Sequence, residues 1–488
     1  MNLIDSLIIL GFFSLTFYIG YSSNRKSNSE SDYFLGGRNL PWWALSLSLV
    51  ATETSTLTFL GIPALSYSGD FSFLSLAIGL VIGRVISAVF ILPQYMTGNF
   101  LSIYQWVGLK FGTSSQITLS LLFSIIRILS DGVRLYAASL PLSFMIVQYF
   151  PSNWNFQEIS ILSLVILSTA TILYSAYGGF RAVVWTDFLQ FIVYCLGGVI
   201  VIVLLSLDFG SITNLISKNP DKWKIFHFTF TNTKGELDPY YFLFSIPGGI
   251  LLALGSHGTD QMLVQRLLAC KNLNESRLAL IFSGFVVLLQ FVIFLTIGAY
   301  LVYALPSVPT PNRVFSDYIV NILNTPWKGV ILAGVFASSM STLSSTLNSL
   351  TLTTQVDMKL RFKSSSSPIW ITIIWGIMLL VSSLIPFILD ETTKNSIVEL
   401  GLSFASYVFG PMVALFFLEV FPLPERKKFH SSFFPLVLAF SIALTFLGKV
   451  YFAMPFTWIV AYGILNFYSL YILGFGITLI SLRSKKGN

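Results

Sequence analysis

The stretch VATETSTLT, residues 50–58, lies inside a long apolar segment and interrupts it. Six of the seven residues from Thr52 to Thr58 are polar, and Gly61 and Pro63 follow. Inside a bilayer, freed backbone groups must find partners within the protein, and Ser and Thr side chains supply such partners where a helix unwinds. We therefore expect a membrane helix over residues 41–67 that is broken in its middle.

The composition of the 488 residues indicates a membrane protein, because 55% are hydrophobic and only 10% are charged. Soluble globular proteins carry about 25% charged residues. The composition excludes a soluble enzyme, a disordered protein and a fibrous protein. The apolar residues form long runs, which argues against a β-barrel. The net charge of +7 is spread over short loops, as is usual beside membrane spans, and indicates neither a nucleic-acid partner nor an obligatory protein partner.

The apolar runs predict an all-α polytopic protein with thirteen transmembrane helices. A span needs about 20 apolar residues to cross the hydrocarbon core of the lipid bilayer. The predicted spans are 3–22, 41–67, 71–97, 116–150, 157–176, 181–206, 241–267, 278–304, 328–358, 368–389, 396–420, 432–448 and 456–481.

An odd number of spans places the two termini on opposite sides. With the N-terminus outside, the inner segments hold 17 Lys and Arg residues and the outer segments hold 8. Cytoplasmic segments carry the excess of positive charge in membrane proteins. We therefore expect a multi-pass protein of the cell membrane with its N-terminus outside and its C-terminus inside.

A second interrupted span is predicted at residues 241–267. It contains Pro247-Gly248-Gly249 and then the polar run GSHGTDQ at residues 255–261. Paired broken helices at corresponding places of two halves are typical of transporters built from inverted repeats, with a binding site at mid-membrane. Either segment taken alone is also compatible with a Gly- or Ser-mediated packing seam.

Each broken span opens a set of five spans, which divides the chain. The predicted parts are a peripheral helix and cytoplasmic loop at 1–40, a first inverted repeat at 41–206, an outer loop at 207–240, a second inverted repeat at 241–420, and two peripheral helices with a short cytoplasmic tail at 421–488.

Small hydroxyl side chains recur on one face of the span at 328–358. Ser338, Ser341, Thr342 and Ser345 follow the helical spacing i, i+3, i+4 and i+7. A hard cation such as sodium prefers oxygen ligands, and these hydroxyls could supply them together with carbonyls of an unwound neighbour. Close packing of two helices through small residues is the alternative. Asp187 is a further candidate, because a carboxylate within a span is either functional or the partner of an arginine or a backbone group.

At these residues the chain resembles the sodium:solute symporter family, which includes sugar, proline, sialate, iodide, monocarboxylate and vitamin carriers. Four motifs carry the resemblance. They are SDYFLGGR at 31–38, the YGG–AVVWTD run at 177–187, VQR at 264–266 and MSTLS at 340–344.

The resemblance implies a leucine-transporter-type core of ten helices in two inverted five-helix repeats, with the sodium ion as coupling ion. In the family a sodium ion lies between the first and eighth core helices. Carried over, its ligands are the carbonyls of Ala51, Thr54 and Ser338 and the hydroxyls of Ser341 and Thr342. Members that couple a second sodium use the aspartate of the fifth core helix with further hydroxyls, a pattern matched by Asp187, Ser344 and Ser345.

The expected substrate region departs from the sugar-carrier pattern. Thr58 aligns with the position where sugar carriers have Gln, and Asp260 with a position often held by Asn. Glu53 stands where a neutral residue is more usual, and His257 lies in the second broken span. We interpret these four residues as substrate-binding candidates. The run at 51–55 is nearer to the branch that carries iodide, monocarboxylates and vitamins, which weakens the case for a sugar.

These features predict a secondary transporter, not an enzyme. We expect sodium-coupled import of a small organic or anionic solute by alternating access. Proton coupling through His257, Asp260 or Glu53 is the alternative. A membrane-embedded enzyme or sensor is the third hypothesis, but the sequence has no His-Glu-x-x-His motif, no phosphate-binding Gly-rich motif and no output domain.

Overall fold

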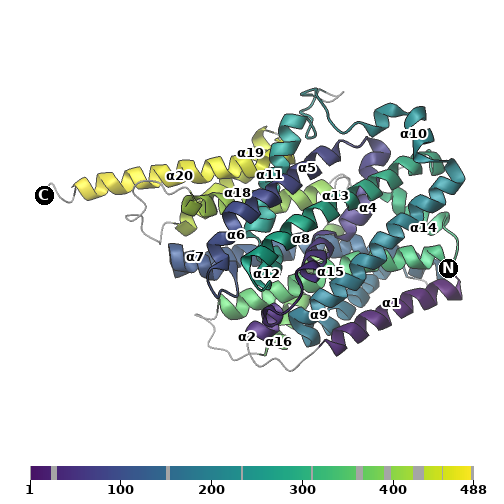
Figure 1. Ribbon diagram of the computed structural model, residues 1–488, viewed down its shortest axis with the longest axis horizontal. Coiled ribbons are helices and arrows are strands. Elements are labelled where there is room, and N and C mark those ends of the chain that lie inside the picture. The colour runs from purple at the N-terminus through teal and green to yellow at the C-terminus, as the bar shows by residue number, and fades with distance from the viewer. Residues whose placement is uncertain are drawn as a thin grey trace.

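The computed structural model describes residues 2–23, 30–149, 154–231, 235–308, 311–358, 367–388, 397–420, 434–452 and 454–484. These residues form helices, and the β-structure among them is limited to two isolated bridges, His227–Tyr241 and Thr231–Leu237 (Figure 1). Most of the predicted inner basic residues, at 25–26, 359–363, 426–428 and 485–486, lie outside the described residues.

The helices of the first half follow the predicted spans. They are α1 (Leu3–Ser22), α2 (Glu30–Leu35), η1 (Gly36–Arg38), α3 (Trp42–Glu53), α4 (Thr56–Ser68), α5 (Phe73–Ile86), η2 (Ser87–Ile91), α6 (Leu92–Met96), α7 (Ile103–Phe111), α8 (Thr113–Tyr149), α9 (Phe156–Phe209), α10 (Ile212–Lys218) and η3 (Pro220–Trp223).

The second half repeats the pattern of a broken helix followed by long ones. Its helices are α11 (Phe242–Thr259), α12 (Gln261–Leu268), α13 (Leu273–Ala304), η4 (Pro311–Arg313), α14 (Val314–Asn321), α15 (Trp327–Val356), α16 (Pro368–Ser382), η5 (Ile385–Phe387), α18 (Ile397–Val420), α19 (Phe434–Phe452) and α20 (Phe456–Ser484).

Membrane-spanning helices are confirmed, but the count of thirteen is not. Within the described ranges, nine helices are long and apolar enough to cross a membrane, or ten if the bent pair α3–α4 is one span. Part of the difference lies in α9, whose 54 residues cover two predicted spans. One crossing needs only about 20 residues. Gly179, at φ 60° and ψ −167°, separates the two legs, and its positive φ is one that glycine adopts at no steric cost.

The second break is narrower than the sequence predicts. α11 runs through Pro247-Gly248-Gly249 without interruption, and the chain leaves the helix only at Asp260, at φ −89° and ψ 118°. Pro247 is the sixth residue of α11, so the Leu243 carbonyl lacks its intrahelical N–H partner, yet the helix continues through this position. Gly249 serves packing, because a Cβ there would overlap the Leu76 carbonyl of α5.

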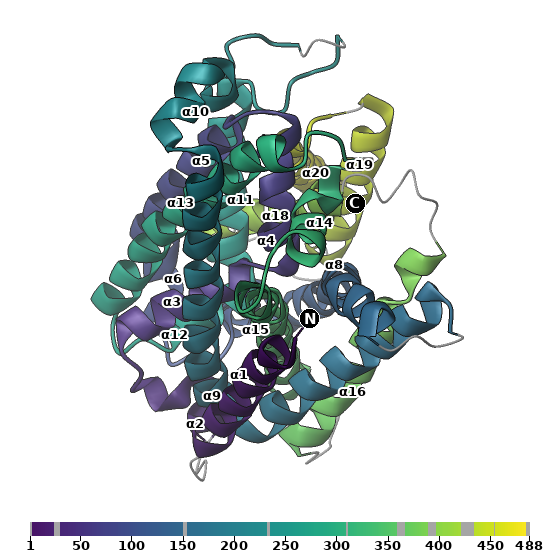
Figure 2. The same ribbon diagram turned by 90° about the vertical axis from the view of Figure 1, so that its right-hand side faces the viewer.

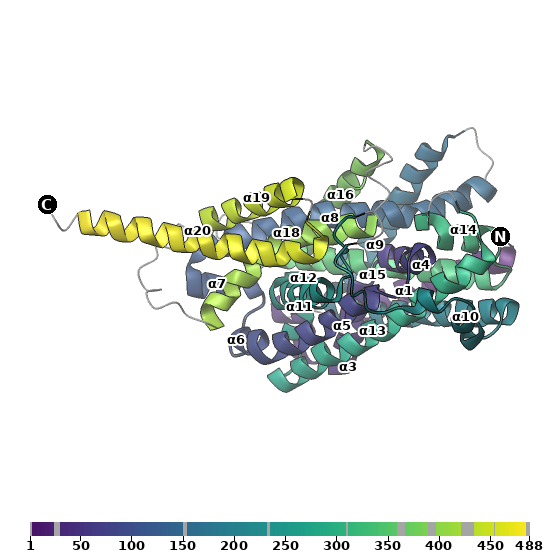
Figure 3. The ribbon, with the colours of Figure 1, turned by 90° about the horizontal axis from the view of Figure 1, so that it is seen from above.

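α15 is the centre of the packing. In Figure 2 it lies in the middle of the molecule among α4, α8, α9 and α12. Of the residues in its 18-residue apolar stretch, 94% are buried. α18, α19 and α20 pack together along one flank, and α20 extends beyond the rest (Figure 3). At the other end, Asp5 of α1 accepts hydrogen bonds from the Gly329 N–H at 2.9 Å and the Thr325 hydroxyl at 2.7 Å. The N-terminus therefore lies on the same side as the start of α15.

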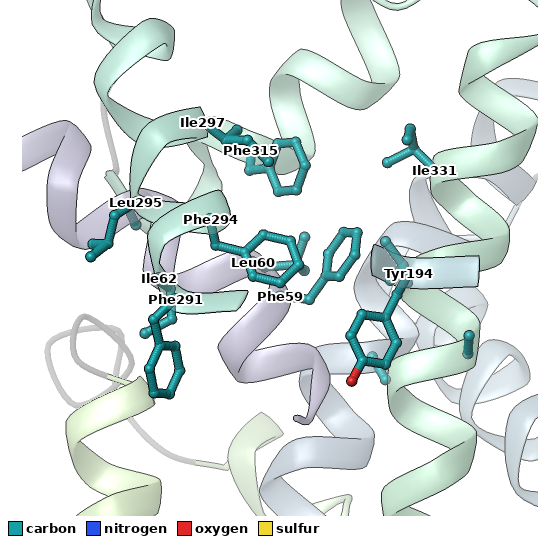
Figure 4. Packing of buried hydrophobic residues seen from close by; sticks show 14 of the residues in the cluster. Phe59, Leu60, Ile62, Tyr194, Phe291, Phe294, Leu295, Ile297, Phe315 and Ile331 are labelled. Carbon is teal, nitrogen blue, oxygen red and sulfur yellow. The ribbon is translucent and has the colours of Figure 1, made fainter. Parts of the chain in front are cut away.

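An aromatic cluster fixes α4, the second half of the broken helix. The Phe59 ring lies 5.0 Å from Phe294 of α13 and 5.4 Å from Phe315 of α14, between ring centroids (Figure 4). Ile331 of α15 and Tyr194 of α9 lie on the other side of Phe59 in the same view. α4 is thus held by α9, α13, α14 and α15.

Gly298 lets α13 approach α4 closely, and a substitution at Gly298 tests how tightly these two helices pack. A Cβ at Gly298 would overlap the Pro63 carbonyl and the Ser66 hydroxyl. We expect Gly298→Ala to lower the free energy of unfolding by about 1–3 kcal/mol, because backbone must shift to make room. Gly11→Ala in α1 is the control, since a Cβ there meets no atom within 4 Å. Chemical denaturation in detergent measures both; equal stability of the two variants would contradict the close approach.

Candidate sodium and substrate site

The first broken helix leaves two residues extended between α3 and α4. Thr54 has φ −81° and ψ 94°, and Ser55 has φ −90° and ψ 173°. The axes on either side differ by 62°. The Thr54 hydroxyl and the Gln290 amide of α13 exchange hydrogen bonds of 3.0 Å and 2.9 Å. The predicted break is confirmed, and a side chain from a neighbouring helix holds one of its polar residues.

The hydroxyl stripe of α15 faces the end of α3. Ser341 Oγ donates to the Ala51 carbonyl at 2.7 Å, and Thr342 Oγ1 to the Thr52 carbonyl at 3.2 Å. The same two hydroxyls lie 3.2 Å and 3.3 Å from the Ser338 carbonyl. All five residues are buried. Neutral oxygens of two helices therefore converge at the break, a donor set that suits a small hard cation.

Four of the five predicted sodium ligands are brought together in this way. For the fifth, the Thr54 carbonyl, no hydrogen bond among the described residues places it in this group; the Thr54 hydroxyl pairs with Gln290. The Thr52 carbonyl belongs to the same group of oxygens, and the sequence interpretation missed it. Its position beside Ala51 in the last turn of α3 was the available signal.

Asp187 of α9 forms an ion pair inside the protein. Its Oδ2 lies 3.0 Å from Arg266 Nη2 and accepts a hydrogen bond from Ser48 at 2.6 Å. Ser345 Oγ is 3.5 Å from the same oxygen, and Arg266 also donates to Ser345. Ser344 turns away and donates to the Ser341 carbonyl at 3.1 Å. The structure thus joins Asp187 and Ser345, leaves Ser344 on another face, and adds Arg266 of the VQR motif as a partner that sequence reasoning had not assigned.

A cavity of about 130 Å³ opens beside the break. Its wall is mostly apolar, with residues such as Ile62, Phe73 and Phe291, and includes the polar groups of residues 52–55 and Thr58. Two arginines of α8, Arg127 and Arg134, also line it. A largely apolar pocket with a few placed polar groups is typical of a small-molecule site.

The four predicted substrate residues are not equivalent. Glu53 and Thr58 line the cavity. Glu53 forms an ion pair with the buried Arg84 of α5, and His257 is completely buried with Nε2 3.6 Å from the Glu53 carboxylate. Asp260 forms an ion pair with Arg127 and caps α12 by accepting from the Met262 N–H at 2.9 Å. His257 and Asp260 therefore support residues of the cavity rather than line it.

Charged residues of α8 form a ladder along one face. Arg134 Nη1 lies 3.0 Å from Asp131 Oδ1, and Arg127 Nη1 lies 3.8 Å from Asp131 Oδ2. Thr346 of α15 donates to Asp131 Oδ2 at 2.5 Å. Asp131 therefore pairs with both arginines of its own helix.

Comparisons with known proteins agree with this geometry. The family model described as "Sodium:solute symporter family" matches residues 33–424. The chain is 26% identical over 447 residues to the sodium-coupled monocarboxylate transporter 2 of Mus musculus, covering 87% of this chain and 69% of that protein. It is 26% identical over 440 residues to the sodium/sialic acid symporter SiaT of Proteus mirabilis strain HI4320, covering 86% and 84%.

A solved structure shows the same fold. A Na⁺-coupled sialic acid symporter in a substrate-bound outward-open state aligns with a TM-score of 0.80 and 22% identity, over 96% of this chain and 97% of that one. MHP1, a nucleobase-cation-symport-1 family transporter in a closed conformation, aligns with a TM-score of 0.63 and 15% identity, over 94% and 96%. The fold is therefore that of the leucine-transporter-type carriers, and the chain is a transporter rather than an enzyme. With the family model covering most of its length, this chain belongs to the sodium:solute symporter family.

Proposed function

We propose that this sodium-coupled symporter imports a small solute with a carboxylate group, using a sodium ion bound where α15 faces the break between α3 and α4. The observation that carries the proposal is the meeting of the Ser341 and Thr342 hydroxyls with the Ala51 and Thr52 carbonyls, beside a cavity that contains arginine side chains.

The sodium ion is proposed to take the carbonyl oxygens of Ala51, Thr54 and Ser338 and the hydroxyl oxygens of Ser341 and Thr342. The two hydroxyls already lie 2.7 Å to 3.3 Å from the carbonyls of Ala51, Thr52 and Ser338. Sodium would replace their hydroxyl protons as the partner of the Ala51 and Ser338 carbonyls, and the Thr54 carbonyl would have to join the group. Bound sodium would join α3 to α15 and favour one conformation of the pair. Its release on the inner side would remove that link and allow the two repeats to move.

A second sodium is proposed at Asp187 with Ser344 and Ser345. In the present arrangement the Arg266 guanidinium neutralises Asp187. Asp187 Oδ1 has no hydrogen-bond partner among the described residues and is the oxygen that a second ion would use. Because Arg266 already balances the charge of this carboxylate, the second ion should bind more weakly than the first.

The solute is proposed to lie in the cavity, against Thr58 and Glu53, with His257 and Asp260 as supporting groups. Arg134 is the proposed anchor for its carboxylate. Arg134 Nη1 is engaged by Asp131, while its Nε has no hydrogen-bond partner among the described residues. The relatives named above carry monocarboxylates or sialic acid, which are both carboxylates.

The charge of the solute determines what drives it. A monoanion entering with one sodium moves no net charge, so only the sodium gradient acts, at about 1.4 kcal/mol for a tenfold gradient. With two sodium ions one charge crosses, and a potential of 100 mV adds about 2.3 kcal/mol. Uptake into proteoliposomes with and without an imposed potential therefore distinguishes one coupled sodium from two.

The proposed organisation keeps residues 41–206 and 241–420 as inverted repeats in a cell-membrane protein, with the N-terminus outside and the C-terminus inside. Residues 207–240 would then form an outer loop. The lipid bilayer and the solute are the partners that this proposal requires.

The test is a thermal-shift screen of the purified chain against carboxylates, sugars, amino acids and inorganic anions, each in sodium and in choline. We expect a carboxylate to raise the unfolding temperature in sodium only, followed by sodium-dependent uptake of the same compound. A ligand that stabilises equally in choline, or stabilisation only by neutral sugars, would contradict the proposal.

Arg134→Gln tests the proposed anchor. A charged hydrogen bond contributes about 1.5–3 kcal/mol, so the half-saturating concentration of the carboxylate should rise roughly 10- to 100-fold. The thermal shift caused by sodium alone serves as the internal control, because Arg134 is not among its proposed ligands. Loss of both shifts would indicate a structural role for Arg134 instead.

A further inference from the structure

A loop between α10 and α11 is fastened to the end of the broken helix. Residues 222–227 of this loop contact residues 67–71, which include the last turn of α4 and the start of its connection to α5. Lys222 Nζ donates to the carbonyls of Tyr67 and Gly69 at 2.8 Å and 2.9 Å. Trp223 stacks on Phe71 with ring centroids 4.5 Å apart. The loop therefore contacts the connection directly after α4.

His227 lies between two carboxylates at this contact. Its Nε2 is 2.6 Å from Asp70 Oδ2, and its Nδ1 is 2.6 Å from Asp238 Oδ2. The other oxygen of each carboxylate accepts a backbone N–H at 2.9 Å, from Ser72 and Tyr240 respectively. Both carboxylates are thus held in place on opposite sides of the ring.

This geometry favours a doubly protonated imidazole over a neutral ring between two ionised carboxylates. A neutral imidazole carries one N–H and one lone pair, so one of its nitrogens would present a lone pair to a carboxylate oxygen. The imidazolium donates from both nitrogens and neutralises one of the two negative charges. Removing its proton converts one of the two hydrogen bonds into a repulsive contact.

Besides Asp70 and Asp238, the charged residues near His227 are engaged by groups outside the ring, so His227 is the main titratable group of this contact. From the same loop, Lys222 is engaged by carbonyls and Lys224 lies 2.8 Å from Asp221. Asp70 comes from the α4–α5 connection and Asp238 from the segment before α11. Partial burial lowers the pKa of His227, but its hydrogen bonds to Asp70 and Asp238 outweigh burial, so the pKa is raised above its ordinary value. The contact is therefore complete below about pH 6.5 and is lost as the pH rises through the raised pKa of His227.

We propose that His227, Asp70 and Asp238 form a proton-binding site that fastens the 220–241 loop to the outer end of α4. α4 also carries Thr58 of the cavity, twelve residues before Asp70. Protonation on the side of the membrane that this loop faces would restrain α4, and deprotonation would free it to move. The restraint would slow any transport step in which α4 moves.

A double-mutant cycle between His227→Gln and Asp70→Asn tests the site in the full-length protein in detergent. At pH 6.0 each single variant should lower the unfolding temperature by about 1–3 °C, and the double variant should lower it no further than the larger single effect. At pH 9.0 the unfolding temperature of the wild type should no longer exceed those of the two single variants and the double variant. Lys224→Gln is the matched control, because its pair with Asp221 is exposed and should matter at neither pH.

Additive losses at pH 6.0, or the same coupling at both pH values, would overturn the proton site. A second measurement needs no folded variant: hydrogen exchange at the imidazole C2 position, followed by mass spectrometry of the wild type, reports the pKa of His227. A value above about 6.5 supports the proposal, and a value at or below it contradicts the proposal.

The transport consequence rests on the proposed function and is measured separately. Sodium-driven uptake by the wild type should fall several-fold when the pH on the side that the loop faces is changed from 8.5 to 6.0. Uptake by His227→Gln should fall less. Equal falls would refute the restraint on α4. Absence of uptake in every protein would instead count against the proposed function, while the thermal cycle still decides on the proton site.

Discussion

Removal of the hydroxyls of Ser341 and Thr342 is expected to raise the sodium concentration needed for half-maximal uptake by at least about 100-fold. The variant Ser341→Ala/Thr342→Val keeps the shape of α15 but deletes two of the five proposed sodium ligands. Each polar contact to a charged group contributes about 1.5–3 kcal/mol, and two of them exceed 3 kcal/mol together. The measurement is initial uptake into proteoliposomes as a function of external sodium.

Ser349→Ala is the matched control for this variant. It removes a hydroxyl oxygen from the same helix, but among the described residues Ser349 Oγ donates only to the Thr346 carbonyl of its own helix, at 2.9 Å. Its sodium dependence should match that of the wild type. An unchanged sodium dependence in the double variant would refute the ligand assignment, and an equal loss in Ser349→Ala would point to general damage to α15.

Replacement of Arg266 by Met is expected to lower the free energy of unfolding by about 3–5 kcal/mol. Arg266 and Asp187 are 1% and 0% exposed, so the variant leaves a carboxylate buried without its counter-charge. The double variant Arg266→Met/Asp187→Asn removes both charges and should recover most of the loss. Chemical denaturation in detergent gives the three free energies.

Lys110→Met provides the comparison for the buried pair. Lys110 forms an ion pair with Glu419 at 2.7 Å, but its side chain is 37% exposed, so its loss should cost no more than about 1 kcal/mol. A double variant as unstable as Arg266→Met alone would show that packing, not the unpaired charge, causes the loss.

The sequence predicted the elements that depend on local composition. Polar residues from Thr52 to Thr58 interrupt an apolar run, and α3 ends at Glu53 within that stretch. The spacing of Ser341 and Thr342 placed them on one face, and that face meets the end of α3. In both cases the information lies within a few turns of one helix.

Partners from distant segments could not be predicted. Arg84 is paired with Glu53 and Arg266 with Asp187, but nothing in the spacing of these residues along the chain indicates the pairs. Gln290 reaches Thr54 across 236 positions. Such contacts depend on how helices cross, and helix crossings are set by close approaches such as that at Gly298.

Two predictions about helix boundaries differed from the structure for physical reasons. The sequence predicts that Pro247-Gly248-Gly249 takes part in the second break, but these residues lie within the intact α11. Gly249 allows its close contact with α5, and Gly248 its contact with Thr457 of α20. The spans at 157–176 and 181–206 join in α9, because one glycine with positive φ turns the chain without a loop.

The most direct test of the account is a pair of experimental structures, one in sodium chloride and one in choline chloride. We expect density for one ion in sodium alone, bounded by the Ala51 and Ser338 carbonyls and the Ser341 and Thr342 hydroxyls. Absence of ion density at this place in sodium chloride, with the Ser341 hydroxyl still bonded to Ala51 in both structures, would contradict the proposed coupling site.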